Sequence, residues 1–287
     1  MQMNRCAVTG ATGYVGGCVV RFFRSHGWQV LELGRNLPNG GDRVCYRLDA
    51  EVPLKALAGI DTLIHCAYDF HARSASAMQT INVQGSVRLL KAACEMGMGK
   101  VIFISSMAAY EGCKSQYGAA KLAVEHEVLN SNTIVVRPGM IYGQDAGGLF
   151  AALRRVVSAL PIVPLIGDGR YPLFTAHEND LCELLFDLAM DHAQSRERQP
   201  IVAAAPETVE FRQLLRDLAL AAGRHPLLLP LPWRLPFYGL RLLEAIGLQI
   251  GLRSDSVLSV VEANRKPEAG TDTTMRNRFR RFSVDDL

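Results

Sequence analysis

The chain has 287 residues, of which 49% are hydrophobic and 21% are charged. That length allows one large or two modest domains, and the hydrophobic fraction is sufficient for a packed core, which argues against a disordered chain. The formal net charge of +3 is too small to indicate a nucleic-acid-binding surface, and we expect the short basic run near the C-terminus, Arg276, Arg278, Arg280 and Arg281, to be solvated.

The seven cysteines are scattered, and no two of them have the CxxC spacing. We therefore expect no disulfide framework and no metal site, and a cytoplasmic location in a reducing compartment. The first glycine turn begins at Gly10, which leaves no room for a signal peptide before it. The most hydrophobic stretch, 226–252, is interrupted by prolines and charges, so it predicts no transmembrane segment but an amphipathic helix near 237–248. We expect this helix to pack on the protein itself, with peripheral membrane contact as the alternative.

Strands and helices alternate along the first half of the chain. Short apolar runs predict strands at 5–9, 29–33, 44–48, 62–66, 101–105 and 133–136. Helical patterns cover 14–26, 74–96 and 117–129. This rhythm indicates βαβ units with right-handed crossovers, and hence an α/β fold with a Rossmann-type, doubly wound parallel sheet.

The rhythm changes after residue 139, where prolines and glycines become frequent, and helical patterns dominate from residue 211 onward. We expect a dinucleotide-binding domain over 1–140, rejoined by about 174–205. Segments 141–173 and 206–287 would form a smaller, mostly helical C-terminal lobe that binds the substrate.

A glycine-rich turn separates the first strand from the first helix. Gly10, Gly13 and Gly16 are spaced GxxGxxG, which permits a tight turn, close approach of backbone N–H groups to a pyrophosphate, and close packing of helix on strand. The helix dipole would favour the phosphates. The segment predicts a dinucleotide site, with a merely structural turn as the alternative. The residues expected to bind the cofactor here are Gly10, Thr12, Gly13, Tyr14, Val15 and Gly16.

The end of the second strand indicates which dinucleotide binds. Glu32 lies inside the strand, whereas Arg35 lies just past its end, where an arginine can meet a 2′-phosphate. This favours NADP over NAD, although an ordinary surface arginine is the alternative. Asp49, after the third strand, could contact the adenine ring or simply form a turn.

Ser106, Tyr117 and Lys121 form the predicted catalytic group. Tyr117 and Lys121 are four residues apart on one helix face, and Ser106 follows the fifth strand at the edge of the sheet where ligands bind. A phenol is a poor base at neutral pH, and a nearby ammonium would lower its pKa. Tyr117 would then exchange a proton with a substrate oxygen that Ser106 holds, while hydride moves at the adjacent carbon.

These motifs together resemble the extended short-chain dehydrogenase/reductase family, which contains nucleotide-sugar epimerases, dehydratases and reductases. The resemblance covers roughly residues 4–205 and includes TGATGYVG from Thr9 and YGAAK from Tyr117. Further matching segments are LIHCA at 63–67, NVQG at 82–85, RPGMIYG at 137–143, GDG at 167–169 and HENDL at 177–181. It implies that Ala67, Tyr117, Lys121 and Pro138 also line the cofactor.

The sequence departs from the family between its serine and its tyrosine. Only ten residues separate Ser106 from Tyr117, whereas a longer loop that borders the substrate is usual in the family. Ser105 and Ser106 are adjacent, and we choose Ser106 because it stands four residues before Tyr110, as in the family's SSxxxYG pattern.

We therefore expect an NAD(P)-dependent oxidoreductase or epimerase that acts on a carbonyl or secondary alcohol of a small molecule, with nucleotide sugars among the candidates. The alternatives are an NAD-retaining nucleotide-sugar epimerase, a non-catalytic dinucleotide sensor or scaffold, and a membrane-linked sterol-type dehydrogenase. A homodimer is compatible with the sequence.

Overall fold

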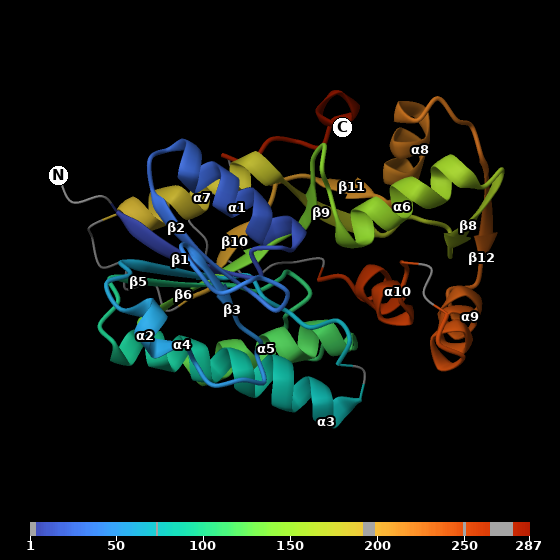
Figure 1. Ribbon diagram of the computed structural model, residues 1–287. Coiled ribbons are helices and arrows are strands. Elements are labelled where there is room, and N and C mark those ends of the chain that lie inside the picture. Colours follow the sequence, from blue (N-terminus) through green and yellow to red (C-terminus); the bar gives the residue numbers. More distant parts are fainter. Residues whose placement is uncertain (1–3, 73, 192–198, 249–250, 265–277) are drawn as a thin grey trace. The chain divides into compact units, whose positions relative to one another are not determined.

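The computed structural model describes residues 4–72, 74–191, 199–248, 251–264 and 278–287 (Figure 1). The chain forms two compact units. The first comprises Met1–Ser106, Ala120–Arg137 and Asn179–Ile201, and the second comprises Met107–Ala119, Pro138–Glu178 and Val202–Leu287. The second unit therefore takes 107–119, a segment that the expected boundaries place in the first domain.

The first six strands of the chain and β10 form a seven-stranded sheet, in the order β10-β6-β5-β4-β1-β2-β3. All five pairings from β6 to β3 are parallel; Val8 of β1, for example, pairs with Glu32 on one side and Ile64 on the other. The order of the first six strands is that of a Rossmann fold, which confirms the predicted fold class. The strands are β1 Arg5–Thr9, β2 Gln29–Gly34, β3 Arg43–Cys45, β4 Thr62–His65, β5 Lys100–Ile104, β6 Thr133–Pro138 and β10 Ile201–Ala203.

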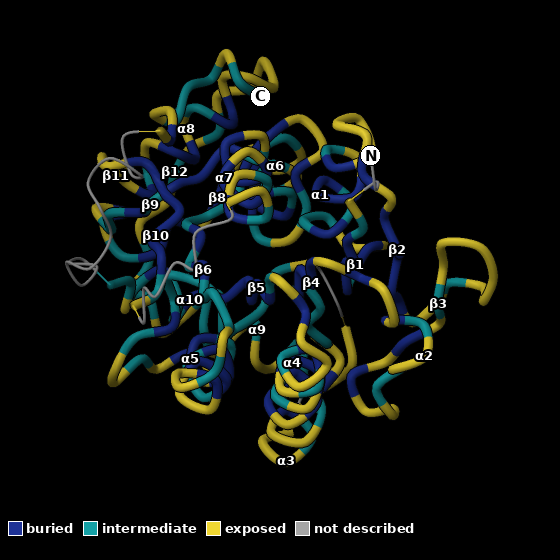
Figure 2. Tube along the Cα trace, turned by 90° about the vertical axis from the view of Figure 1, so that its left-hand side faces the viewer, coloured by how far each residue is buried: buried dark blue, intermediate teal, exposed yellow. Residues whose placement is uncertain are grey.

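Helices cover both faces of this sheet (Figure 1). One face carries α1 (Tyr14–Ser25) and α7 (Glu178–Met190), and the other carries α2 (Leu54–Leu57), α4 (Gly85–Glu95) and α5 (Gln116–Val128). Because both faces are covered, the central strands are buried on each side, as the dark blue of β1, β2, β4 and β5 in Figure 2 shows.

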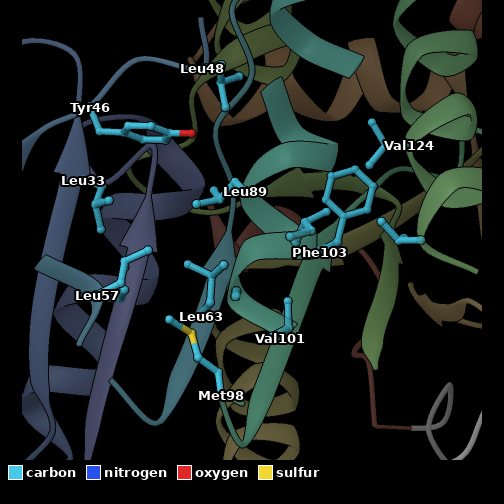
Figure 3. Close-up of a cluster of buried hydrophobic side chains, with 14 of the residues drawn as sticks. Leu33, Tyr46, Leu48, Leu57, Leu63, Leu89, Met98, Val101, Phe103 and Val124 are labelled. Carbon is cyan, nitrogen blue, oxygen red and sulfur yellow. The ribbon is translucent and has the colours of Figure 1, made fainter. Parts of the chain in front are cut away.

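The core between the sheet and α4 and α5 is apolar (Figure 3). Leu63, Leu89 and Phe103 are fully buried there, and burying such a side chain contributes about 1.5–3 kcal/mol. Tyr46 and Leu48 also belong to this core, although β3 ends at Cys45 and is shorter than the predicted strand 44–48. They are buried as part of a loop, in which the Tyr46 N–H still donates to the Gly34 carbonyl at 3.1 Å.

The predicted helix 74–96 is interrupted. It consists of α3 (Ala75–Ala77), a π-helical segment η1 (Met78–Gln84) and α4. Single wide turns of this kind often occur at functional sites. Here the wide turn presents Asn82, whose amide accepts from the Asp69 N–H at 2.7 Å and donates to the Asp69 carbonyl at 3.0 Å. Asn82 thereby fixes the loop after β4.

The second unit combines helices with two small sheets, so it is less purely helical than its sequence suggests. One sheet has the order β11-β9-β7 and the other consists of β12 and β8. Its strands are β7 Met140–Tyr142, β8 Ile162–Ile166, β9 Pro172–His177, β11 Thr208–Glu210 and β12 Leu227–Leu231. Its helices are α6 Gly148–Ala159, α8 Phe211–Ala221, α9 Arg234–Ala245, α10 Ser254–Val261 and the short η2 Val284–Asp286.

Within the basic run, Arg280 pairs with Asp286 at 3.6 Å and Arg281 pairs with Glu207. Arg276 lies outside the described residues. Across those residues, no helix combines the length and apolar character that a membrane crossing requires.

Candidate active site

The three glycines of the glycine turn have different structural roles. Gly10 has φ +67°, and a Cβ there would lie 2.9 Å from the Ala67 Cα atom. A Cβ on Gly16 would lie 2.2 Å from the Gly10 carbonyl oxygen, so only glycine lets α1 begin this close to the turn. Gly13 closes the turn by donating to the Gly10 oxygen at 2.8 Å.

The N-terminus of α1 has the features of an anion-binding helix end. Its N-cap residue, Gly13, offers no side-chain cap, and its first turn contains no acidic residue. The first N–H groups of a helix have no partner inside the helix, and the helix dipole favours negative charge at this end. The turn can therefore hold a pyrophosphate, as the spacing of the glycines predicts.

A buried hydroxyl joins the ends of β1 and β4 beside this turn. The Thr9 Oγ1 atom lies 2.6 Å from His65 Nδ1 and accepts from the Ala67 N–H at 3.2 Å. His65 is fully buried, and burial lowers its pKa to about 3, so the ring is neutral. The Thr9 hydroxyl can then donate to Nδ1 while accepting from Ala67, which holds Ala67 against Gly10.

Thr9→Val should therefore destabilise the protein, because it leaves the Ala67 N–H and the His65 ring nitrogen without their buried partner. We expect the free energy of unfolding to fall by about 1–3 kcal/mol in urea titrations. Thr9→Ser keeps the hydroxyl and serves as the matched control. A Thr9→Val protein as stable as the wild type would show that this hydroxyl does not hold the loop.

The carboxylate in β2 is unavailable to a ribose. Glu32 is buried, with Arg24 at 2.7 Å and Arg43 at 3.8 Å from its Oε1 atom. Just after the strand, Arg35 is exposed, and its Nη1 donates to Asp69 Oδ1 at 3.0 Å. At the end of β2, the charge that is exposed to a ligand is therefore the positive charge of Arg35.

Asp49 is held by Arg47. The Arg47 guanidinium donates to both carboxylate oxygens, at 3.0 Å and 2.8 Å, and this pairing lowers the pKa of Asp49. An adenine ring that contacted Asp49 would share the carboxylate with Arg47. The role of Asp49 in cofactor binding therefore stays a prediction.

The side chain of Lys121, a residue of α5, is buried and reaches the end of β5. Its Nζ donates to the Ile104 carbonyl oxygen at 2.7 Å and lies 4.7 Å from the centre of the Phe103 ring. Burial lowers the pKa of Lys121 to about 8, while Cys66 and Glu125 act in the opposite direction. Since this value remains above neutrality, Lys121 carries its positive charge at pH 7.

The two adjacent serines have different surroundings. Ser105 is buried and donates a hydrogen bond to Glu125, a carboxylate that also accepts from Arg137 at 3.0 Å and 2.5 Å. Ser106, the next residue, is only half-buried. The Ser105 hydroxyl is thus used inside the protein, which favours Ser106 as the serine that could hold a substrate oxygen.

Tyr117 lies in the first turn of α5, four residues before Lys121. The N-terminus of this helix is capped from far along the chain: the Asp255 carboxylate accepts from the Gln116 and Tyr117 N–H groups at 2.7 Å and 3.1 Å. A Cβ on Gly118 would lie 2.1 Å from the Ala108 carbonyl oxygen, which explains the glycine after Tyr117.

The predicted site residues are divided between the two units. The first unit holds eleven of them, namely Gly10, Thr12, Gly13, Tyr14, Val15, Gly16, Arg35, Asp49, Ala67, Ser106 and Lys121. Tyr117 and Pro138 belong to the second unit, in which the Pro138 carbonyl accepts from the Met107 N–H at 3.0 Å. Helix α5 runs from one unit into the other and carries both Tyr117 and Lys121.

Sequence reasoning missed two residues that support this site. Glu125 stands four residues after Lys121 on α5, so an acidic residue at that spacing was the available signal. Asp255 has no comparable signal, because nothing local connects it with a helix that begins at Gln116. Among the described residues, no three His, Cys, Asp or Glu side chains are grouped as a metal site would require.

The fold and the glycine turn define a nicotinamide-dinucleotide enzyme of the extended short-chain dehydrogenase/reductase type. The family described as NAD dependent epimerase/dehydratase matches residues 6–204. The chain therefore belongs to the NAD dependent epimerase/dehydratase family.

Relatives and solved structures agree with this membership. UDP-glucose 4-epimerase of Vibrio cholerae is 24% identical over 268 residues, which cover 81% of this chain and 80% of that protein. Ceramide reductase of Caulobacter vibrioides is 31% identical over 173 residues, which cover 56% of this chain and about half (53%) of that protein. The structure of MoeE5 in complex with UDP-glucose and NAD has a TM-score of 0.67 at 20% identity and covers 93% of this chain and 95% of its own, which shows a shared fold.

Proposed function

We propose that the protein transfers hydride between NADP and a carbonyl or secondary alcohol, with Tyr117 as the acid/base, Lys121 as its electrostatic support and Ser106 as the group that holds the substrate oxygen. When bound, the nicotinamide cofactor supplies or accepts the hydride. The observation that carries the proposal is the Lys121 ammonium. It is buried, fixed to the end of β5 and placed one helical turn after a tyrosine.

The proton would pass through Tyr117. A fixed positive charge favours a phenolate over a phenol, and it acts more strongly in a buried setting than in water. Tyr117 can then give a proton to a substrate oxygen during reduction, or take it during oxidation. Ser106 would orient the same oxygen by a hydrogen bond.

The choice of NADP rests on Arg35. Because Glu32 is buried and already paired, the end of β2 presents no carboxylate for the hydroxyls of a ribose. A 2′-phosphate could receive two parallel hydrogen bonds from the Arg35 guanidinium, in exchange for the present contact with Asp69.

Arg35→Ser should weaken NADPH binding about 10- to 100-fold, since hydrogen bonds to charged groups contribute roughly 1.5–3 kcal/mol. The affinity for NADH should change little. Fluorescence titration of both cofactors checks this. Arg43→Ser, which changes a similarly exposed arginine on the neighbouring strand, is the control and should leave both affinities unchanged. Equal losses for NADPH and NADH would refute the assignment of Arg35 to a 2′-phosphate.

The substrate is proposed by analogy. UDP-glucose is bound to MoeE5 and named in the Vibrio cholerae relative, so a nucleotide sugar is the first candidate. The purified full chain should oxidise NADPH with at least one carbonyl compound in a panel of nucleotide sugars and ketones, and the ceramide reductase relative is the reason to include a lipid ketone. NAD that copurifies with the chain, without any NADPH turnover, would favour the NAD-retaining epimerase instead.

We also propose a cytoplasmic location, which is supported by the seven free cysteines. A homodimer stays a prediction, which sedimentation of the purified chain would test.

A further inference from the structure

Helix α9 of the second unit exposes an apolar face. None of its residues is buried, and its large apolar side chains recur every three or four positions, as one face of a helix requires. Leu242 is 64% exposed and Ile246, just past the helix, is 68% exposed. We call this set the α9 face; its residues are Leu235, Tyr238, Leu242 and Ile246.

The opposite side of α9 is anchored to α10, its neighbour in the second unit (Figure 1). The Glu244 carboxylate accepts from the Ser254 N–H at 2.9 Å and from the Ser254 hydroxyl at 2.7 Å. This contact fixes the rotation of the helix, so the α9 face turns away from the side that packs on the protein. The sequence predicts an amphipathic helix here that packs on the protein itself, but the apolar residues of the α9 face are exposed.

The exposed charges on α9 are positive. Arg234 and Arg241 are exposed, and Glu244, which Ser254 engages, is the only acidic residue between positions 226 and 248. Arg234 also lies 5.6 Å from the centre of the Trp233 ring. Apolar side chains flanked by arginines, with no exposed carboxylate, are typical of helices that lie in the interface of an anionic membrane.

We propose that the α9 face docks this protein on an anionic lipid membrane, with α9 lying in the plane of the headgroups. The helix has 12 residues and is too short to cross a bilayer, so it would dock on the surface. A symmetric contact between two copies fits less well. A two-fold interface would bring the same arginine-bearing, carboxylate-free surface of each copy together.

Sedimentation of the full chain with vesicles tests this proposal. One set of vesicles contains phosphatidylcholine alone, and the other contains equal parts of phosphatidylcholine and phosphatidylglycerol. The protein should bind the second set more tightly, and added salt should weaken that binding. Leu242→Asp should reduce the affinity at least about tenfold, since it places a charge in the apolar boundary of the interface. Leu54→Asp, an equal change at an exposed leucine in the first unit, should leave the affinity unchanged.

A second variant keeps the test decisive if Leu242→Asp fails to fold. Arg241→Gln retains the apolar face and should lower the affinity for the phosphatidylglycerol vesicles about fivefold, since one basic residue contributes about 1 kcal/mol near such a surface. The proposal is overturned if the wild type does not bind these vesicles, or if Leu242→Asp and Leu54→Asp act equally. It is also overturned if Leu242→Asp only converts a dimer into a monomer, which would assign the α9 face to a contact between copies.

Discussion

Replacing Tyr117 by phenylalanine is expected to lower kcat by about 10²- to 10⁴-fold, the range that a positioned acid/base contributes. The substitution removes only the hydroxyl, and the Tyr117 backbone N–H can still donate to Asp255. The N-terminus of α5 should therefore remain intact. The affinity for NADPH should change little, so kcat measured at saturating cofactor isolates the loss of the proton-transfer group.

The pH dependence of kcat supplies an independent readout for the same prediction. The pKa of Lys121 is lowered to about 8 by burial, so its positive charge is present below that pH and is lost above it. Support for the Tyr117 phenolate should fade as the pH rises through about 8. Lys121→Met should lower kcat and also remove this inflection. If Tyr117→Phe left every turnover unchanged, a non-catalytic dinucleotide sensor would replace the proposed enzyme.

Local sequence patterns correctly predicted the first strand, the glycine turn and the first helix. The apolar run before Gly10 and the glycines after it impose a strand, a turn and a helix, and these elements have their expected places. The interruption of the helix 74–96 was not predictable in this way. The wide turn carries Asn82, whose amide forms two hydrogen bonds with the backbone of Asp69, and local patterns do not reveal a contact across 13 positions.

The candidate site shows the same limit. The pairing of Tyr117 with Lys121 could be predicted from their spacing, because both lie on one helix. The cap that Asp255 gives to this helix could not be predicted, because Asp255 lies 139 positions after Gln116 in the chain. Ser106 was chosen over Ser105 from its spacing to Tyr110, and the structure adds an independent reason, because the Ser105 hydroxyl donates to Glu125.

Glu125 is also where the largest loss of stability is expected. Its side chain and that of Arg137 are only 5% and 12% exposed, and two guanidinium nitrogens donate to the carboxylate. Glu125→Ala would leave a buried guanidinium unpaired and the Ser105 hydroxyl without its acceptor. We expect the free energy of unfolding to fall by about 3–5 kcal/mol in urea titrations, as is usual when one partner of a buried pair is removed.

The control is an ion pair of the same type at the surface. Arg281 and Glu207 form such a pair with side chains 77% and 46% exposed, so Glu207→Ala should cost less than about 1 kcal/mol. Glu125→Leu combined with Arg137→Leu should destabilise less than the sum of the two single changes, because no charge is then left unpaired. Additive effects would show that the pair does not act as a unit.

Glu125→Gln separates the structural role from the electrostatic one. The amide can still accept from Ser105 and Arg137, but it removes the negative charge that raises the pKa of Lys121. The alkaline inflection of kcat should therefore move to lower pH, even in a protein that remains folded. If the inflection stayed in place while stability fell, Glu125 would act on the packing of α5 alone, and the charge of Lys121 would be governed by its burial.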